Sequence, residues 1–340
     1  MIISWISPET LSQQFELCGV TEGSYVVILT DNLVTDQFQA NNLDGLEKLG
    51  CRFDIFNIQW DQKETTTIKL QSEGLRSALT QADLVINLTN SLTHEIIENS
   101  RLNQKRILCI RTSEFEPYSH SMTSAGVLQR SDRIQTLLPN TEHISINTEA
   151  GTNLMFSTDA LKNDSYTGVP EKEGYLANWP AGYINFSTDA TGLDGEIVLM
   201  PGDIVNDALH LVKSPVVLQI RGGNIVEMIG ESSDANLLKA QLESFSDREH
   251  AYMLKGFSIG LIYFRSDYFS GPFDPRKVSA VGTALRGGWV TLIFGNNVAN
   301  SLCVTLTSPN LLFDNVEIFL NGDFAATMEP DIYELALMGL

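Results

Sequence analysis

The second half of this chain is organised around the stretch Asn178-Trp179-Pro180-Ala181-Gly182-Tyr183-Ile184-Asn185-Phe186-Ser187-Thr188. Its Pro-Ala-Gly segment predicts a turn, and the β-branched and aromatic residues that follow predict a strand. The five letters of Phe156–Ala160 recur as Phe186–Ala190. A repeat array needs at least three units, so one echo does not indicate an array. We expect the two segments to be neighbouring strands of one sheet.

Short apolar strands alternate with helical stretches over the first part of the chain. Such alternation is typical of a parallel sheet with helices on both faces, and it predicts a Rossmann-like α/β domain over residues 1–142. We expect its strands at 25–29, 53–58, 83–88 and 106–110. A helix that begins after Ser113 is expected to close the domain at Pro139-Asn140.

The first strand lacks the glycine-rich turn that a dinucleotide site requires. It is followed by Thr30-Asp31-Asn32-Leu33-Val34, which has no glycine to let a pyrophosphate approach the backbone. Polar residues at strand ends, such as Asp31, are explained by capping of the helices that follow. We therefore expect no nucleotide cofactor in this domain.

Strands and turns dominate residues 143–340. One helix is expected at 234–249, where apolar residues recur at helical spacing. Arg221-Gly222-Gly223-Asn224 predicts a hairpin turn. The pattern indicates an α+β domain with a mainly antiparallel sheet, and its strands are expected at 143–146, 153–156, 183–186, 196–200, 216–220, 225–229, 257–261, 289–294, 302–306 and 316–320.

The charge of the chain limits its partners. Its 340 residues include 42 acidic and 22 basic residues, which gives a formal net charge of -20. This charge opposes binding to nucleic acid or to anionic membranes. It is typical of a soluble protein whose copies repel one another, and it would also attract a basic peptide. No stretch approaches the roughly 18 apolar residues that a membrane helix needs.

The cysteines indicate a reducing, cytoplasmic setting. Cys18, Cys51, Cys109 and Cys303 show no CxxC spacing and lie in apolar surroundings typical of buried thiols. The start of the chain, Met1-Ile2-Ile3-Ser4-Trp5, lacks the basic region and long apolar core of a signal peptide. The five histidines are scattered and form no H-E-x-x-H motif, and the chain has no G-x-S-x-G nucleophile elbow.

A series of short motifs in the second domain occurs in an order that resembles a known family. The motifs are Gly-Thr-x-Leu-x-Phe-Ser (151–157), Asn-x-Pro-x-Gly (178–182), Asp-Gly-x-Ile-Val (194–198), the Gly-Gly hairpin, Ile-Gly-Leu (259–261), Phe-Gly-Asn-Asn (294–297) and Ile-Phe-Leu-Asn-Gly (318–322). Together they are similar to the leucyl aminopeptidases of the aminopeptidase T type, whose scaffold dihydroxypyridine dioxygenases share. The resemblance covers residues 145–325 well and the first domain only in outline.

The aminopeptidase resemblance implies a two-metal site, but this chain lacks the ligands. In the family the site consists of two Glu, one His and a His-x-Asp pair. The matching positions here hold Tyr183, Gly256, Thr291, Ser308 and Asn310. A hydrolytic metal needs nitrogen and carboxylate ligands to anchor it and to activate water. The resemblance therefore implies no bound metal, and we expect no cofactor.

The loss of these ligands favours binding over catalysis. The chain is similar to metal-free relatives that bind peptides in ribosomal-peptide (RiPP) natural-product pathways of the crocagin type. We expect a non-catalytic protein that binds a precursor peptide and presents it to a separate modifying enzyme of the same pathway. One alternative is a metal-independent hydrolase or cyclase that uses Tyr183 or Ser308, and another is a purely structural subunit that neither turns over nor binds a peptide. The candidate peptide-binding residues are Trp179, Tyr183, Tyr263, Arg286, Trp289, Thr291, Ser308 and Asn310.

The resemblance also implies a homodimer formed through the second domain. The apolar tail Ile332–Met338 follows acidic residues suited to a helix start, and we expect it to dock as a short helix, because an apolar stripe left in water would form an exposed patch.

Overall fold

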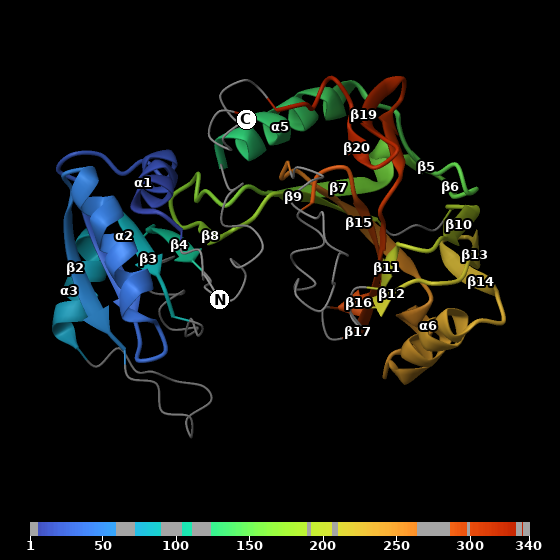
Figure 1. The fold of residues 1–340 in the computed structure, drawn as a ribbon, viewed down its shortest axis with the longest axis horizontal. Helices are drawn as coiled ribbons and strands as arrows, with labels where there is room; N and C mark the ends of the chain where they lie inside the picture. The colour runs from blue at the N-terminus through green and yellow to red at the C-terminus, as the bar shows by residue number, and fades with distance from the viewer. Residues whose placement is uncertain are drawn as a thin grey trace. The chain divides into compact units, whose positions relative to one another are not determined.

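The computed structural model describes residues 6–58, 72–89, 104–110, 124–188, 192–205, 210–263, 286–297, 300–330 and 335. The chain divides into two compact units (Figure 1). The first unit contains residues 1–125 and 166–181, and the second contains residues 126–165 and 182–340. Each unit is thus built from two separate stretches of chain, whereas the sequence pattern places a single boundary near residue 142.

The first unit contains the expected parallel sheet. Its five strands lie in the order β2 (Arg52–Asn57), β1 (Tyr25–Thr30), β3 (Leu84–Asn87), β4 (Arg106–Ile110) and β8 (Leu176–Trp179), and every pair is parallel. β3 is buried along its whole length, and β1 and β4 are buried at all but their first residue. Continuous apolar runs of this kind are typical of a sheet covered on both faces.

Three helices of this unit begin at hydroxyl caps. They are α1 (Pro8–Leu17), α2 (Asp36–Lys48) and α3 (Glu73–Gln81), and the side chains of Ser7, Thr35 and Ser72 accept a backbone N–H of the first turn. Asp31, at the end of β1, accepts the N–H groups of Leu33 and Val34 and so forms a turn that leads to α2.

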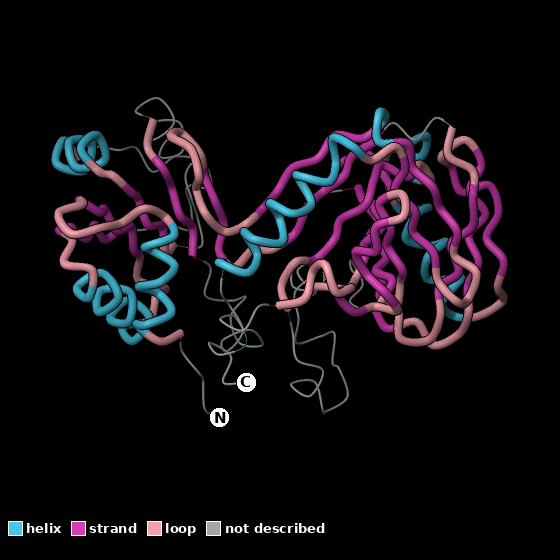
Figure 2. Tube along the Cα trace, turned by 90° about the horizontal axis from the view of Figure 1, so that it is seen from above, coloured by secondary structure: helices cyan, strands magenta, loops and turns pink. Residues whose placement is uncertain are grey.

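The second unit contains two antiparallel sheets. The eight-stranded sheet has the order β14 (Asn224–Ile229), β13 (Val216–Arg221), β10 (Gly195–Leu199), β6 (Asn153–Ser157), β5 (His143–Asn147), β18 (Asn310–Phe313), β19 (Val316–Leu320) and β20 (Asp323–Phe324). The seven-stranded sheet has the order β12 (His210–Leu211), β11 (Ile204–Val205), β17 (Asn300–Leu306), β16 (Val290–Asn297), β15 (Leu254–Gly260), β9 (Tyr183–Thr188) and β7 (Leu161–Tyr166). Strands predominate over helices in this unit (Figure 2).

The helices of the second unit differ from expectation at two places. The expected helix 234–249 is divided into α6 (Ser233–Ser244) and α7 (Arg248–Ala251). The helix expected to close the first domain is described as α5 (Ser124–Leu137), which continues into the 3-10 turn η2 (Leu138–Asn140) and belongs to the second unit. Buried Arg130 anchors α5, because its Nε donates to the carbonyl of Leu261 at 2.7 Å.

The prediction that the two copies of Phe-Ser-Thr-Asp-Ala are neighbouring strands of one sheet is wrong. The first copy ends β6 in the eight-stranded sheet and continues as the 3-10 turn η3 (Thr158–Ala160), whereas the second copy ends β9 in the seven-stranded sheet. The phenylalanine of each copy nevertheless packs against the same residue, Phe257. The ring of Phe257 lies 4.8 Å from that of Phe156 and 4.7 Å from that of Phe186.

The two sheets share one apolar core. Across the seven-stranded sheet the register aligns Ile184, Ile259, Val290 and Leu306, and all four are fully buried. The next aligned row consists of Phe186, Phe257, Leu292 and Val304. One cluster of buried side chains joins these rows to residues of the eight-stranded sheet, α5 and α6. Aligned apolar rows of this kind form the interior of a two-sheet sandwich.

The four cysteines are free thiols, and Cys18, Cys51 and Cys109 are buried as expected, whereas Cys303 is only half-buried. Burial raises the pKa of the Cys18 thiol to about 12, so this group stays protonated at neutral pH. Among the described residues, no helix is long and apolar enough to cross a membrane.

The position of Phe257 between two rings gives the first prediction. We expect Phe257→Ala to lower the free energy of unfolding by about 3–5 kcal/mol, because it removes a fully buried ring and leaves a cavity. Urea denaturation measures this change. As a control, Ile55→Ala in the exposed part of β2 should change the free energy by less than about 0.5 kcal/mol. A Phe257→Ala variant as stable as the control would contradict this account of the core.

Candidate functional site

A row of uncharged polar side chains crosses the seven-stranded sheet next to its apolar rows. Ser258 on β15 pairs with Asn185 on β9 and with Thr291 on β16, and Thr291 pairs with Thr305 on β17. Residues directly opposite one another in neighbouring strands point to the same face, so these four form one polar row. Ser258, Thr291 and Thr305 are buried, and the hydroxyls of Thr291 and Thr305 lie 2.7 Å apart in a hydrogen bond.

The motif resemblance aligns both Thr291 and Gly256 with metal-ligand positions of the aminopeptidases. The polar row contains Thr291 but not Gly256. Gly256 lies opposite Ser187 and Ile293. A Cβ atom added there would lie 1.9 Å from the carbonyl oxygen of Phe186, so β15 has no room for a glutamate side chain at this position. The residue of β15 that pairs with Thr291 is Ser258. The motifs did not predict Ser258, because they contain no information on how the strands pair.

Three of the predicted binding residues lie close together, next to the start of β16. The guanidinium carbon of Arg286 lies 4.5 Å from the ring centre of buried Trp289, and the ring of Tyr263 stacks on Phe324 at 6.2 Å. Tyr263, Arg286 and Phe324 line a cavity of about 390 Å³ together with Gly287, Asp323, Glu329, Pro330 and Leu335. This cluster offers aromatic rings and one cation to a ligand.

The other predicted residues are spread over several strands. Tyr183 is half-buried at the start of β9, opposite Gly260, whose N–H donates to the carbonyl of Trp289, so Tyr183 lies on the same sheet face as the polar row. Trp179 is buried in β8 of the first unit. Asn310 donates to Asn147 and accepts the N–H of Asn321, so it supports a turn of the eight-stranded sheet. The eight predicted residues therefore do not form a single site.

Exposed Ser308 lines a cavity of about 460 Å³ that also contains Asp203. Asp203 is a buried carboxylate that accepts the N–H of Met200 and both the N–H and the hydroxyl of Thr307. Burial raises the pKa of Asp203, and these hydrogen bonds oppose the rise. Because its two oxygens already accept these three donors, Asp203 is poorly placed to act as a base for Ser308, which weakens the hydrolase alternative.

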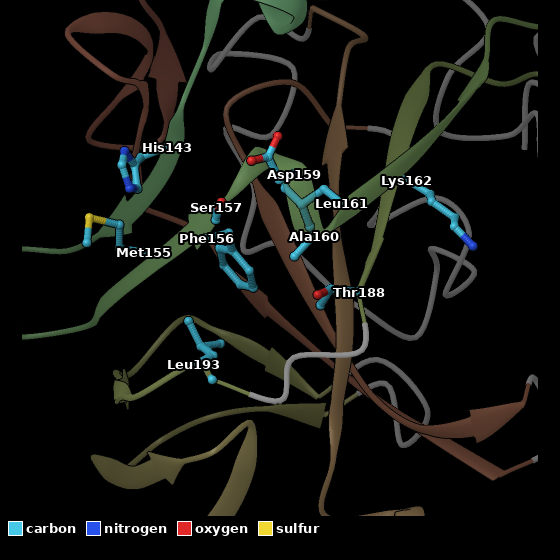
Figure 3. Close-up of a pocket in the computed structure, with 11 residues that line it drawn as sticks. His143, Met155, Phe156, Ser157, Asp159, Ala160, Leu161, Lys162, Thr188 and Leu193 are labelled. Carbon is cyan, nitrogen blue, oxygen red and sulfur yellow. The ribbon is translucent and has the colours of Figure 1, made fainter.

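The largest of the described cavities, about 590 Å³, lies where the two copies of Phe-Ser-Thr-Asp-Ala come together (Figure 3). It is lined by His143, Met155, Phe156, Ser157, Asp159, Ala160, Leu161, Lys162, Thr188, Gly192 and Leu193. Its volume falls within the range of small-ligand pockets. None of these residues was predicted as a site residue, although the repeated five letters marked the place.

The described residues do not provide a metal site. No group of three or more His, Cys, Asp or Glu side chains gathers in this part of the chain. The three described histidines each approach a different aspartate, in the pairs His143–Asp314, His210–Asp234 and His250–Asp247. A mononuclear iron oxygenase uses two histidines and one carboxylate at a single centre, and a hydrolytic zinc site needs at least three such ligands. His94 and His120 lie outside the described residues.

Comparison with known proteins finds one matching sequence family and solved structures of similar fold. A sequence model of the family NicX, described as 2,5-dihydroxypyridine 5,6-dioxygenase, matches residues 7–271. The solved structure of 2,5-dihydroxypyridine dioxygenase from Pseudomonas putida KT2440 is 18% identical, with a TM-score of 0.70 over 94% of this chain and 96% of that chain. Wild-type AmpT from Thermus thermophilus is 11% identical, with a TM-score of 0.54 over 94% and 99%. No curated protein sequence matches the chain.

The AmpT similarity confirms the expected aminopeptidase T-like α/β fold. Both structures are less than 25% identical to this chain, so the likeness concerns the fold alone.

Asp203 provides a prediction about pH. Folding raises its pKa, so the folded state holds the proton more tightly than the unfolded state, whose Asp pKa is near 4. The stability that Asp203 contributes is fully present below that unfolded-state pKa and is lost as pH rises through the folded-state pKa. Relative to Asp203→Asn, the wild type should therefore lose stability as pH increases from about 4 to 7. Urea denaturation across this range measures the difference, and a difference that is flat or of opposite sign would refute the assignment.

Proposed function

The chain belongs to the NicX family, that of 2,5-dihydroxypyridine 5,6-dioxygenase, and we propose that it is a member without a catalytic metal that binds a peptide. The observation that carries this proposal is the polar row of the seven-stranded sheet. Asn185, Ser258, Thr291 and Thr305 supply hydroxyl and amide groups, which donate and accept hydrogen bonds but hold a divalent metal poorly.

The choice of a peptide rests on the strand edges and on charge. Both sheets of the second unit end in strands, β7 and β20 among them, for which the described residues provide a sheet neighbour on one side only. An unpaired edge offers main-chain hydrogen bonds to an extended peptide. The net charge of -20 favours peptides with Lys or Arg, mainly through the rate of association.

The biological setting of the proposal follows from the resemblance to crocagin-type proteins. The ligand is a precursor peptide of RiPP biosynthesis, and the protein presents it to a separate modifying enzyme in the cytoplasm. The cluster of Tyr263, Arg286 and Trp289 is a contact region for the peptide. We further propose a homodimer formed through the second unit, which light scattering would detect. Of the tail expected to dock in the dimer, all residues except Leu335 lie outside the described part of the chain.

Family membership favours a second candidate, an oxygenase that acts on a dihydroxypyridine. This candidate requires a metal centre formed with residues outside the described ranges, because the described residues provide none. It predicts oxygen uptake when 2,5-dihydroxypyridine and ferrous iron are added to the protein. The peptide-binding proposal predicts no uptake above that of iron and substrate alone.

Metal content and peptide affinity test the proposal together. We expect elemental analysis of the purified protein to find zinc, cobalt, manganese and iron well below one equivalent per chain. We expect titration calorimetry with blocked basic peptides that carry a central aromatic residue to show binding, and mass spectrometry to show the peptides unchanged after incubation.

The contact cluster supplies the variant for this test. Tyr263→Ala should weaken peptide binding by on the order of 1–3 kcal/mol, as truncation of an aromatic contact usually does. Tyr175→Ala is the control, since Tyr175 is an exposed tyrosine of the first unit. One tightly bound metal per chain, or turnover of a peptide, would reject the proposal.

A further inference from the structure

The eight-stranded sheet splits between β6 and β10. All five residues of β6 pair with β5. On its other side β6 pairs with β10 at Asn153 and Glu196 only. Among the described residues, the stretch from Met155 to Ser157 therefore has no strand partner on this side. Alternate residues of a strand direct their backbone N–H and C=O groups to the same side, and Thr152 and Thr158 direct theirs toward the β5 side. The groups of Met155 and Ser157 therefore form a short free edge inside the sheet rather than at its end.

The cavity of about 590 Å³ lies at this split. Met155, Phe156 and Ser157 line one side of it, and Gly192 and Leu193, which lead into β10, line another. Phe156 and Leu193 are buried and give the cavity an apolar floor, whereas 58% of Met155 is exposed at its mouth. Figure 3 shows Phe156 beside Ala160 and Leu193 lower in the view, and both side chains line the cavity. The cavity thus combines a free strand edge with an apolar surface, formed by Phe156 and Leu193, that an apolar side chain of a ligand can contact.

Polar groups surround the floor. Asp159 and Lys162 are exposed, and Figure 3 shows that the Lys162 side chain extends away from Phe156. Thr188 of the second Phe-Ser-Thr-Asp-Ala copy lies beneath them, and His143 lies on the side of Met155. A ligand that enters from solvent can therefore keep its polar parts at the rim while an apolar group reaches the floor.

We propose that this split is the place where the peptide is anchored. A short extended segment pairs with β6 at Met155–Ser157 and inserts one large apolar side chain between Phe156, Leu161 and Leu193. This inference rests on the proposed peptide-binding function and names the recognition mode and the residue class selected. A free strand edge requires an extended backbone as ligand, and the apolar floor selects one side chain, as in other cases of strand addition. This anchor is separate from the cluster of Tyr263, Arg286 and Trp289.

A matched pair of variants tests the position of the anchor. Ser157 is exposed and lines the cavity, so Ser157→Trp fills the cavity without a change to the core. Val226, which is 58% exposed on β14 of the same sheet and does not line the cavity, provides Val226→Trp as the control. The probes are fluorescein-labelled nonapeptides of alternating Val, Thr and Lys whose central residue is Trp or Gly, and anisotropy gives their affinity.

We expect the wild type to bind the Trp probe at least tenfold more tightly than the Gly probe. Ser157→Trp should weaken binding of the Trp probe at least tenfold, and Val226→Trp should leave it unchanged. Methylation of the backbone nitrogens on one edge of the Trp probe should weaken binding tenfold or more, whereas methylation on the other edge should have little effect, because only one edge faces β6. Thermal melting of both variants confirms that they fold.

Three results would overturn the inference, and they are distinguishable. If the wild type binds the Trp probe but Ser157→Trp binds it equally well, the peptide is held elsewhere and only the anchor is refuted. If Val226→Trp alone weakens binding, the peptide pairs with β14 instead. If the wild type binds neither probe nor the peptides of the calorimetric test, the proposed function itself fails and the anchor fails with it.

Discussion

Burial of the apolar face of the seven-stranded sheet is the constraint on which the second unit depends. The rows that contain Ile259 and Phe257 are solvent-free across four strands, and they fix which residues of β9, β15, β16 and β17 share a face. A slip of one residue would move each row to the opposite face, so the register is strongly specified. The same register aligns the polar row, whose position is therefore a consequence of core packing.

The sequence predicted most of the strands because apolar alternation and turn residues are local signals. It predicted the parallel sheet of the first unit for the same reason. The echo of Phe156–Ala160 in Phe186–Ala190 shows the limit of such signals. The identical five-residue sequences predict the same local structure, and both copies do end a strand. The sheet that each strand joins depends on long-range pairing, which a five-residue sequence does not determine.

The candidate site was harder to predict for a similar reason. Thr291 was identified from a motif and lies in the polar row, but its neighbours Ser258 and Asn185 become visible only once the strands are paired. The motif match assigns Gly256 to a metal-ligand position, and the close approach of the Phe186 carbonyl explains why a glycine stands there. Within the buried row, the hydroxyls of Thr291 and Thr305 hydrogen-bond to one another, whereas buried carboxylates would repel one another without a cation. This part of the NicX-family scaffold is therefore stable as a neutral row.

The discontinuous first unit has a consequence for the order in which the protein is made. Its last strand, β8, comes from the segment 166–181, although the other four strands lie before residue 111. During synthesis, β4 therefore emerges from the ribosome without the parallel neighbour that will cover its outer edge. That neighbour arrives only after residues 126–165 of the other unit have been added. The sheet of the first unit thus cannot be completed strand by strand from the N-terminus, and its closure waits for a part of the chain that is translated later.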